Sequence, residues 1–101
     1  MSDQVHSLDE IKSTVSDVAK HYGVKRVALF GSYARGDATN KSDIDLCIEP
    51  GEIRSLIGLS GFRIEIVERL QTDVDIVTSD CLDKKFLQRI QREEVLLYGI
   101  S

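Results

Sequence analysis

The chain has 101 residues, of which 42% are hydrophobic and 30% are charged, and its formal net charge is −4. A chain of this length can bury one modest core and has no residues to spare for a second lobe, so we expect residues 1–101 to form a single domain. Acidic residues outnumber basic ones, so the chain lacks the basic surface with which proteins bind a nucleic-acid backbone. We therefore expect no direct nucleic-acid binding.

Hydrophobic periodicity and turn residues predict alternating helices and strands. In chain order the expected elements are a helix over 8–22, a strand over 24–30, a short helix over 32–35, a strand over 43–49, a helix over 52–72, a strand over 74–78 and a helix over 83–92. Residues 95–98 fit either a short final strand or a continuation of the last helix. This order is that of an α/β (α+β) domain.

Two local signals set helix starts. Ser7 and Glu10 form a capping box at the first helix, and His6 lies before it in a segment that we expect to be mobile. Gly31 breaks the first strand, and Ser32 is placed to cap the short helix that follows.

Targeting signals and metal-binding cysteine motifs are lacking. Residues 1–10 are polar and contain no signal-peptide core, and no apolar run reaches the length of a membrane span. The two cysteines, Cys47 and Cys81, are too far apart in sequence for a Cys-x-x-Cys zinc motif. We therefore expect a cytoplasmic protein with reduced thiols and no membrane partner.

Asp43 and Asp45 are the first candidate site residues. They are two positions apart on a predicted strand, so both side chains leave the same face, roughly 7 Å apart along the backbone. Two such carboxylates can converge on a pair of divalent cations, and hard oxygen ligands suit Mg²⁺ or Mn²⁺. The alternative is that the Asp-x-Asp pair is simply two solvated surface aspartates. For so short a motif, this is the commoner case.

Asp75 is the third candidate. It lies between apolar residues in the strand predicted over 74–78, and if that strand neighbours Asp43 and Asp45, it can complete a metal-binding triad or act as general base on an acceptor hydroxyl. Asp73, at the exposed start of the same strand, is the weaker candidate.

The glycine-serine turn at Gly31 and Ser32 is a candidate phosphate site. Glycine lets the backbone approach a phosphate without a Cβ clash, and the hydroxyl of Ser32 adds a donor. Arg35 is placed to contact phosphate or substrate, with an ion pair to Asp43 or Asp45 as the alternative. A Gly-Ser pair alone is most often only a turn.

Three segments together resemble the minimal nucleotidyltransferases of the DNA polymerase beta-like superfamily. They are residues 31–36 (Gly-Ser-Tyr-Ala-Arg-Gly), 42–46 (Ser-Asp-Ile-Asp-Leu) and 74–77 (Val-Asp-Ile-Val). The combined signature is far more specific than its parts, and the resemblance covers nearly the whole chain. Within that superfamily, the chain is most similar to the MntA-like antitoxins that accompany HEPN-domain ribonuclease toxins. Asn40–Lys41 replaces a proline-acidic pair often found before the Ser-Asp, but all three carboxylate positions are filled.

The resemblance implies a nucleotidyltransferase fold, with a small mixed β-sheet flanked by helices. It implies two Mg²⁺ ions, with Mn²⁺ as the alternative metal, held by Asp43 and Asp45 with Asp75 as the third carboxylate. It also implies ATP as substrate, with Gly31 and Ser32 at the triphosphate. Members transfer AMP from ATP to a hydroxyl, and the MntA-like group modifies a tyrosine of its HEPN toxin.

Two alternatives to this function are kept open. One is an antitoxin that neutralises its toxin by contact alone, and the other is nucleotidyl transfer to a small-molecule hydroxyl. Because so short a chain has no second lobe to hold an acceptor, we expect the acceptor to come from another chain, either a partner protein or a further copy in an oligomer.

Overall fold

The computed structural model describes residues 5–79 and 83–99, so Cys81 lies outside the described residues. Its elements, in chain order, are α1 (Leu8–Tyr22), β1 (Arg26–Phe30), α2 (Gly31–Arg35), β2 (Ile44–Glu49), α3 (Leu56–Leu70), β3 (Val74–Thr78), α4 (Lys84–Glu93) and β4 (Val95–Tyr98). The expected α/β alternation is confirmed, and the last segment is a strand.

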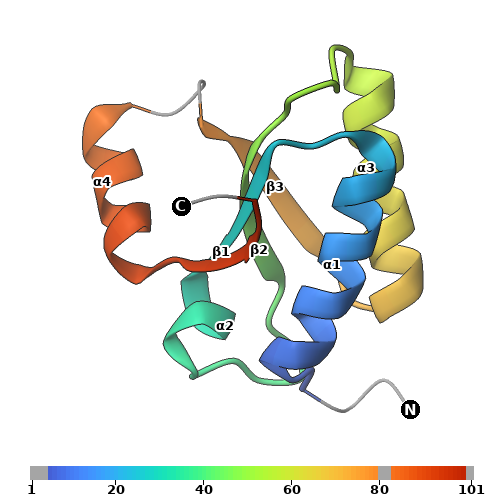
Figure 1. The fold of residues 1–101 in the computed structure, drawn as a ribbon. Helices are drawn as coiled ribbons and strands as arrows, with labels where there is room; N and C mark the ends of the chain where they lie inside the picture. Colours follow the sequence, from blue (N-terminus) through green and yellow to red (C-terminus); the bar gives the residue numbers. More distant parts are fainter. Residues whose placement is uncertain (1–4, 80–82, 100–101) are drawn as a thin grey trace.

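The four strands form one mixed sheet in the order β3-β2-β1-β4. β1 is antiparallel to β2 and to β4, whereas β2 and β3 are parallel. Figure 1 shows α1 and α3 side by side on one face of the sheet, α4 on the other face, and α2 at the end of β1. The expected mixed sheet flanked by helices is therefore confirmed.

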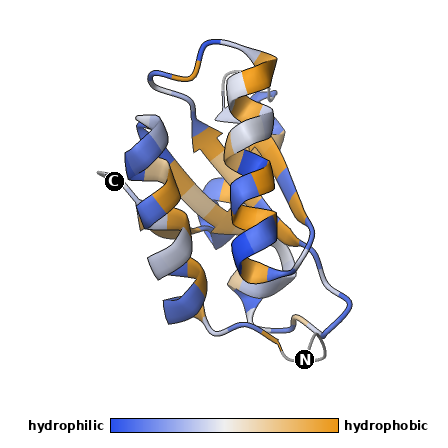
Figure 2. Ribbon diagram, turned by 90° about the vertical axis from the view of Figure 1, so that its right-hand side faces the viewer, coloured by the Kyte–Doolittle hydropathy of each residue, from blue (hydrophilic) through white to orange (hydrophobic). Residues whose placement is uncertain are grey.

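The core lies between the sheet and the pair α1 and α3. In β2 the side chains of Ile44, Leu46 and Ile48 are fully buried on this face, as the period of two along a strand requires. The helices cover them with apolar residues at helical spacing, namely Ile11, Val15, Val18, Phe62, Ile66 and Leu70. Figure 2 shows the same arrangement as apolar stripes on the helices in front of the sheet.

Several predicted boundaries are shifted by one to four residues, and three of these shifts have a clear local cause. β1 begins at Arg26 because Gly23 ends α1 in the left-handed region, with φ of 72°, and Val24 still donates to the carbonyl of Ala19. α3 begins at Leu56, where Ser55 caps it. Ser32 is not a cap: α2 already begins at Gly31, and no side chain caps it.

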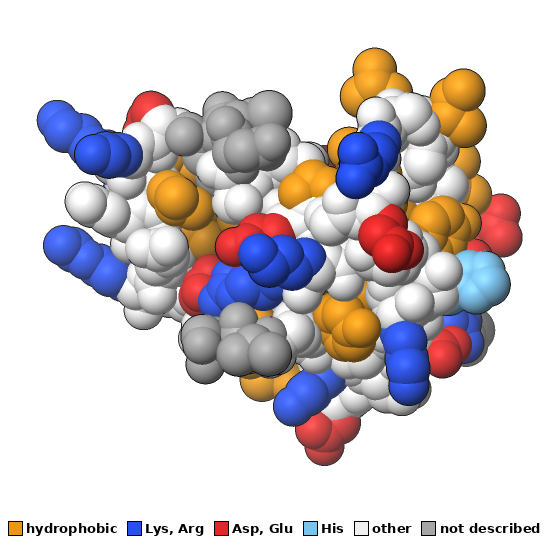
Figure 3. Space-filling view, turned by 45° about the horizontal axis from the view of Figure 1, so that its top comes forward, with side chains coloured by type: hydrophobic (Ala, Val, Ile, Leu, Met, Phe, Trp, Pro, Cys, Tyr) orange, Lys and Arg blue, Asp and Glu red, His pale blue; other side chains and the backbone are white. Residues whose placement is uncertain are grey.

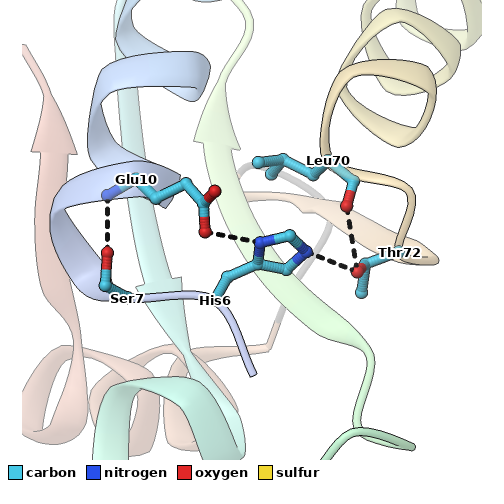
Figure 4. Close-up of polar contacts among 5 residues, drawn as sticks. All are labelled: His6, Ser7, Glu10, Leu70 and Thr72. Atoms are coloured by element: carbon cyan, nitrogen blue, oxygen red, sulfur yellow. Dashed lines mark hydrogen bonds and ion pairs between the residues drawn. The ribbon is translucent and has the colours of Figure 1, made fainter. Parts of the chain in front are cut away.

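The expectation that His6 is mobile is wrong. Its Nδ1 lies 2.6 Å from a carboxylate oxygen of Glu10, and its Nε2 lies 2.8 Å from the hydroxyl of Thr72 (Figure 4). The Thr72 hydroxyl donates its proton to the carbonyl of Leu70, so it accepts from Nε2. Both ring nitrogens of His6 therefore have a hydrogen-bonding partner. His6 thus joins the start of α1 to the turn before β3.

We expect His6→Ala to lower the free energy of unfolding by about 1 kcal/mol, because two hydrogen bonds of a mostly buried side chain are lost. Urea denaturation at pH 6 measures this difference. His21→Ala, on the exposed side of α1, is the matched control and should change stability less. Equal losses in the two variants would mean that the contacts of His6 contribute nothing.

Candidate active site

Asp45 and Asp75 are brought together by the register of two parallel strands. They are direct partners in the pairing of β2 with β3, although 30 residues separate them in the chain. Asp45 alternates with the buried Ile44 and Leu46, so its side chain leaves the sheet on the face away from α1 and α3. Asp75 projects from the same face because parallel partners in register do so.

Asp43 and Asp73 flank this pair. Asp43 is exposed and precedes β2 by one residue, so it lies just outside the strand where it was expected. The backbone carbonyl of Asp73 accepts a hydrogen bond of 2.9 Å from the amide of Ile44. Asp73 therefore helps to fix the register of the two strands through its main chain.

Burial and electrostatic repulsion together raise the pKa of Asp45. Burial is the largest cause, followed by the negative charges of Asp75 and Asp43, while the guanidinium of Arg35 acts in the opposite direction. In residues 5–79 and 83–99, no three carboxylate, imidazole or thiol groups converge closely enough to hold a metal ion. Like charges oppose such convergence, and a cation between them would offset the repulsion. Asp43, Asp45 and Asp75 have the oxygen donors that such an ion requires.

Gly31 lies directly over Asp45. Phe30, the last residue of β1, is the register partner of Asp45, so the chain turns into α2 above that carboxylate. Gly31 has φ of 75°, and a Cβ at this position would meet Oδ2 of Asp45 at 2.3 Å. The left-handed backbone therefore favours glycine here, and any larger residue would also displace the carboxylate of Asp45.

α2 is anchored so that Gly31 and Ser32 stay at the edge of the site. The side chain of Tyr33 is buried in the main core, which fixes the rotation of this five-residue helix. The carbonyl of Ser32 accepts from the amides of Gly36 and Asp37, which ends the helix. Ser32 itself is partly exposed, beside Gly31.

Arg35 does not pair with Asp43 or Asp45. Its guanidinium instead lies 3.4 Å from a carboxylate oxygen of Asp37 and 3.5 Å from one of Glu93, on α4. All three side chains are about half exposed, so these pairs contribute little to stability. Glu93 was not identified from the sequence, because nothing in the motif indicates that α4 returns beside α2.

Most of the chain matches one known protein family. The family model described as "Polymerase beta, Nucleotidyltransferase" matches residues 12–101. The chain belongs to the polymerase beta nucleotidyltransferase family.

Its relatives share nearly the full length of this nucleotidyltransferase. It is 37% identical over 88% of the chain to a Methanocaldococcus jannaschii protein named "Putative protein adenylyltransferase MJ0435", of which 96% is covered. It is 30% identical to protein adenylyltransferase MntA of Thermococcus cleftensis, over 88% of this chain and 94% of that protein.

A solved structure of tri-AMPylated Shewanella oneidensis HEPN toxin in complex with MNT antitoxin has a similar fold. The TM-score is 0.68 at 18% identity, and the match covers 89% of this chain and 71% of that one.

Within residues 5–79 and 83–99, the nucleotidyltransferase has no helix of the length and hydropathy needed to cross a membrane.

Proposed function

We propose that this nucleotidyltransferase transfers AMP from ATP to a tyrosine hydroxyl of a partner HEPN toxin and so acts as an antitoxin in the cytoplasm. The observation that carries the proposal is the pairing of Asp45 with Asp75 beneath Gly31. Two relatives that match nearly all of this chain bear the name protein adenylyltransferase. The structurally similar antitoxin is bound to an AMPylated toxin.

Asp43 and Asp45 would hold two Mg²⁺ ions, with Asp75 as the third carboxylate. When bound, the ions would polarise the α-phosphate and offset the charge of the departing pyrophosphate. Burial, and after it the negative charges of Asp75 and Asp43, raise the pKa of Asp45, and a divalent cation would relieve the repulsion, which supports this assignment. Mn²⁺ prefers the same oxygen donors and is the alternative metal.

Gly31 and Ser32 would receive the β- and γ-phosphates. The lack of a Cβ at Gly31 lets its main chain lie close to the carboxylate of Asp45, and beside it Ser32 offers its hydroxyl and main-chain amide to a phosphate. Arg35 is half exposed and held only by surface ion pairs, so it can exchange Asp37 or Glu93 for a phosphate oxygen.

Asp75 is assigned as general base. It takes the proton of the acceptor hydroxyl, the oxygen bonds to the α-phosphorus, and the bond from that phosphorus to pyrophosphate breaks. Orientation and charge stabilisation would supply most of the rate enhancement.

The acceptor would be supplied by another chain. The described residues form one sheet with its helices, and none of them forms a second lobe over Asp45 and Asp75. A hydroxyl donated by a partner protein completes such an open site more readily than a diffusing small molecule, because docking of the partner fixes its position.

Label transfer from ATP tests the function. The protein, Mg²⁺, α-³²P-labelled ATP and the protein encoded by the adjacent gene are incubated, and label is expected on a HEPN partner. An antitoxin that works by contact alone would neutralise its partner without labelling it. Label recovered only on a small-molecule alcohol would instead indicate nucleotidyl transfer to a small-molecule hydroxyl.

Asp75→Asn is expected to reduce label transfer by about 10²–10⁴-fold, the usual contribution of a general base. ATP binding measured by calorimetry with Mg²⁺ should weaken much less, because Asp43 and Asp45 remain. Asp73→Asn is the matched control and should retain activity, since Asp73 acts through its main-chain carbonyl. Full activity of Asp75→Asn would refute the assignment of the base.

A further inference from the structure

The outward face of α3 carries large apolar side chains that no described residue covers. Ile57 is 85% exposed, Leu56 81% and Ile64 49%. We call these three residues the α3 patch. Figure 2 shows the start of α3 coloured as hydrophobic, and Figure 3 shows hydrophobic side chains gathered at the corresponding end of the molecule. Exposed apolar clusters of this kind mark association surfaces.

The α3 patch is separate from the faces that α3 already uses. Phe62, Ile66 and Leu70 of α3 enter the core. The adjacent side of α3 faces α1. There Gly61 lies against the ring of Tyr22, and Glu65 accepts a hydrogen bond from the hydroxyl of Tyr22. Ile57 and Ile64 are seven residues apart and lie on one line of the helix, pointing away from both contacts.

The position of the α3 patch argues against the AMP acceptor as its occupant. The chain before α3 lies against the start of β1, where the amide of Glu52 donates to the carbonyl of Gly23. Gly31 and Asp45 lie at the other end of β1, and Figure 1 shows α2 and the beginning of α3 at opposite ends of the sheet. A protein bound at the α3 patch would leave the nucleotide site open.

Exposed charges of opposite sign lie at the two ends of α3. Arg54 precedes the helix, Glu68 lies in its last turn, and both are exposed. Among the ion pairs of residues 5–79 and 83–99, none uses either side chain. In an antiparallel pair of α3 helices centred between Ser60 and Gly61, Ile57 of one copy faces Ile64 of the other. Arg54 then comes close to the partner's Glu68.

We propose that two copies of this chain associate through the α3 patch as an antiparallel, two-fold symmetric helix pair. The same surface serves on both copies, as two-fold symmetry requires. Ser60, at the centre, is small enough to let the two helices approach closely. Both nucleotide sites face away from the contact and stay accessible to acceptors.

The dimer is expected to be weak. α3 has 15 residues and is about 22 Å long, so one helix pair buries less than the roughly 800 Å² per partner of a standard interface. We therefore expect a dissociation constant in the micromolar range, on the order of 10 µM. The contact forms at high local concentration without any change at the nucleotide site.

Sedimentation equilibrium of the full chain between about 2 and 300 µM, spanning the expected dissociation constant, tests the proposal. Ile57→Ser should weaken dimerisation at least tenfold, whereas Phe86→Ser, which removes a 41% exposed ring on α4, should not. Arg54→Glu and Glu68→Arg should each weaken the dimer, and the double variant should restore it.

Three outcomes would overturn the proposal. The first is a wild-type chain that stays monomeric at about 300 µM, well above the expected dissociation constant. The second is an unchanged dimer in Ile57→Ser, and the third is no restoration of the dimer in the charge-swapped double variant. If the wild type is monomeric while Ile57→Ser releases a co-expressed HEPN protein, the α3 patch belongs to that protein. Label transfer by Ile57→Ser should equal that of the wild type. If the dimer proposal fails, the proposed AMP transfer therefore still stands, and if AMP transfer fails, the dimer proposal still stands.

Discussion

Asp45→Asn is expected to abolish AMP transfer, by about 10³-fold or more, while making the folded protein more stable. Activity is lost because Asn lacks the negative charge proposed to hold the metal ions. Stability rises because burial and the charges of Asp75 and Asp43 disfavour the ionised form of Asp45 in the folded chain. The gain is small, an increase in melting temperature of about 2 °C, since solvent screens part of the repulsion.

The pH dependence of this stability follows from the direction of the pKa change. The folded-state pKa of Asp45 lies above its ordinary value of 3.8, so the folded protein binds this proton more tightly than the unfolded chain does. The contribution of Asp45 to stability is therefore most favourable below pH 3.8 and declines as the pH rises through the raised folded-state pKa. Above that window the penalty stays constant, and Asp45→Asn removes it at neutral pH.

Differential scanning calorimetry of the two proteins from pH 3 to 7 measures the effect. The difference between the variant and the wild type should widen with pH through this window and then level off. Millimolar Mg²⁺ should raise the melting temperature of the wild type more than that of Asp45→Asn, because bound cation stabilises the folded state. A variant that is less stable than the wild type at pH 7 would contradict the repulsion argument.

Gly31→Ala is the second change with a large expected effect, and it should lower the free energy of unfolding by about 2–4 kcal/mol. Two causes combine: alanine is strained at φ of 75°, and its Cβ would lie 2.3 Å from Oδ2 of Asp45. Relief of this overlap requires Asp45 or the start of α2 to move. AMP transfer should therefore fall as well, even at temperatures where the variant is fully folded.

Gly36→Ala separates the two causes. Gly36 has φ of 83°, but a Cβ there would meet nothing within 4 Å, so this variant reports the backbone strain alone, about 1 kcal/mol. A double-mutant cycle of Gly31→Ala with Asp45→Ala reports the steric part, because the carboxylate is then absent. Equal urea midpoints for Gly31→Ala and Gly36→Ala would show that the approach to Asp45 imposes no steric requirement.

Local sequence was sufficient for elements whose signals are self-contained. The helix Leu8–Tyr22 is flanked by its cap Ser7 and its stop Gly23, although Glu10 contacts His6 and does not complete a capping box, and turn residues bound the strand Val74–Thr78, so the bounds of both elements were predicted correctly. Residues 95–98 could not be assigned, since four apolar residues fit either state. Pairing with β1 makes them a strand.

The candidate site shows the same division. The residue types at Gly31, Asp43, Asp45 and Asp75 indicated phosphate and metal chemistry and the family to which the chain belongs. Of the two roles open to Arg35, the ion pair with Asp43 or Asp45 is not formed, because its guanidinium pairs with Asp37 and with Glu93, which arrives from a helix far along the chain.

The sequence by itself determined which chemical groups this protein carries, because side-chain type and spacing along the chain are read directly from it. Only the tertiary structure decided which of these groups meet. The parallel register of β2 and β3 places Asp75 beside Asp45, the antiparallel pairing of β1 places Gly31 over it, and the packing of α3 leaves Ile57 outside the core. Each of these depends on contacts between distant segments, which form only when one core is buried by all of them together.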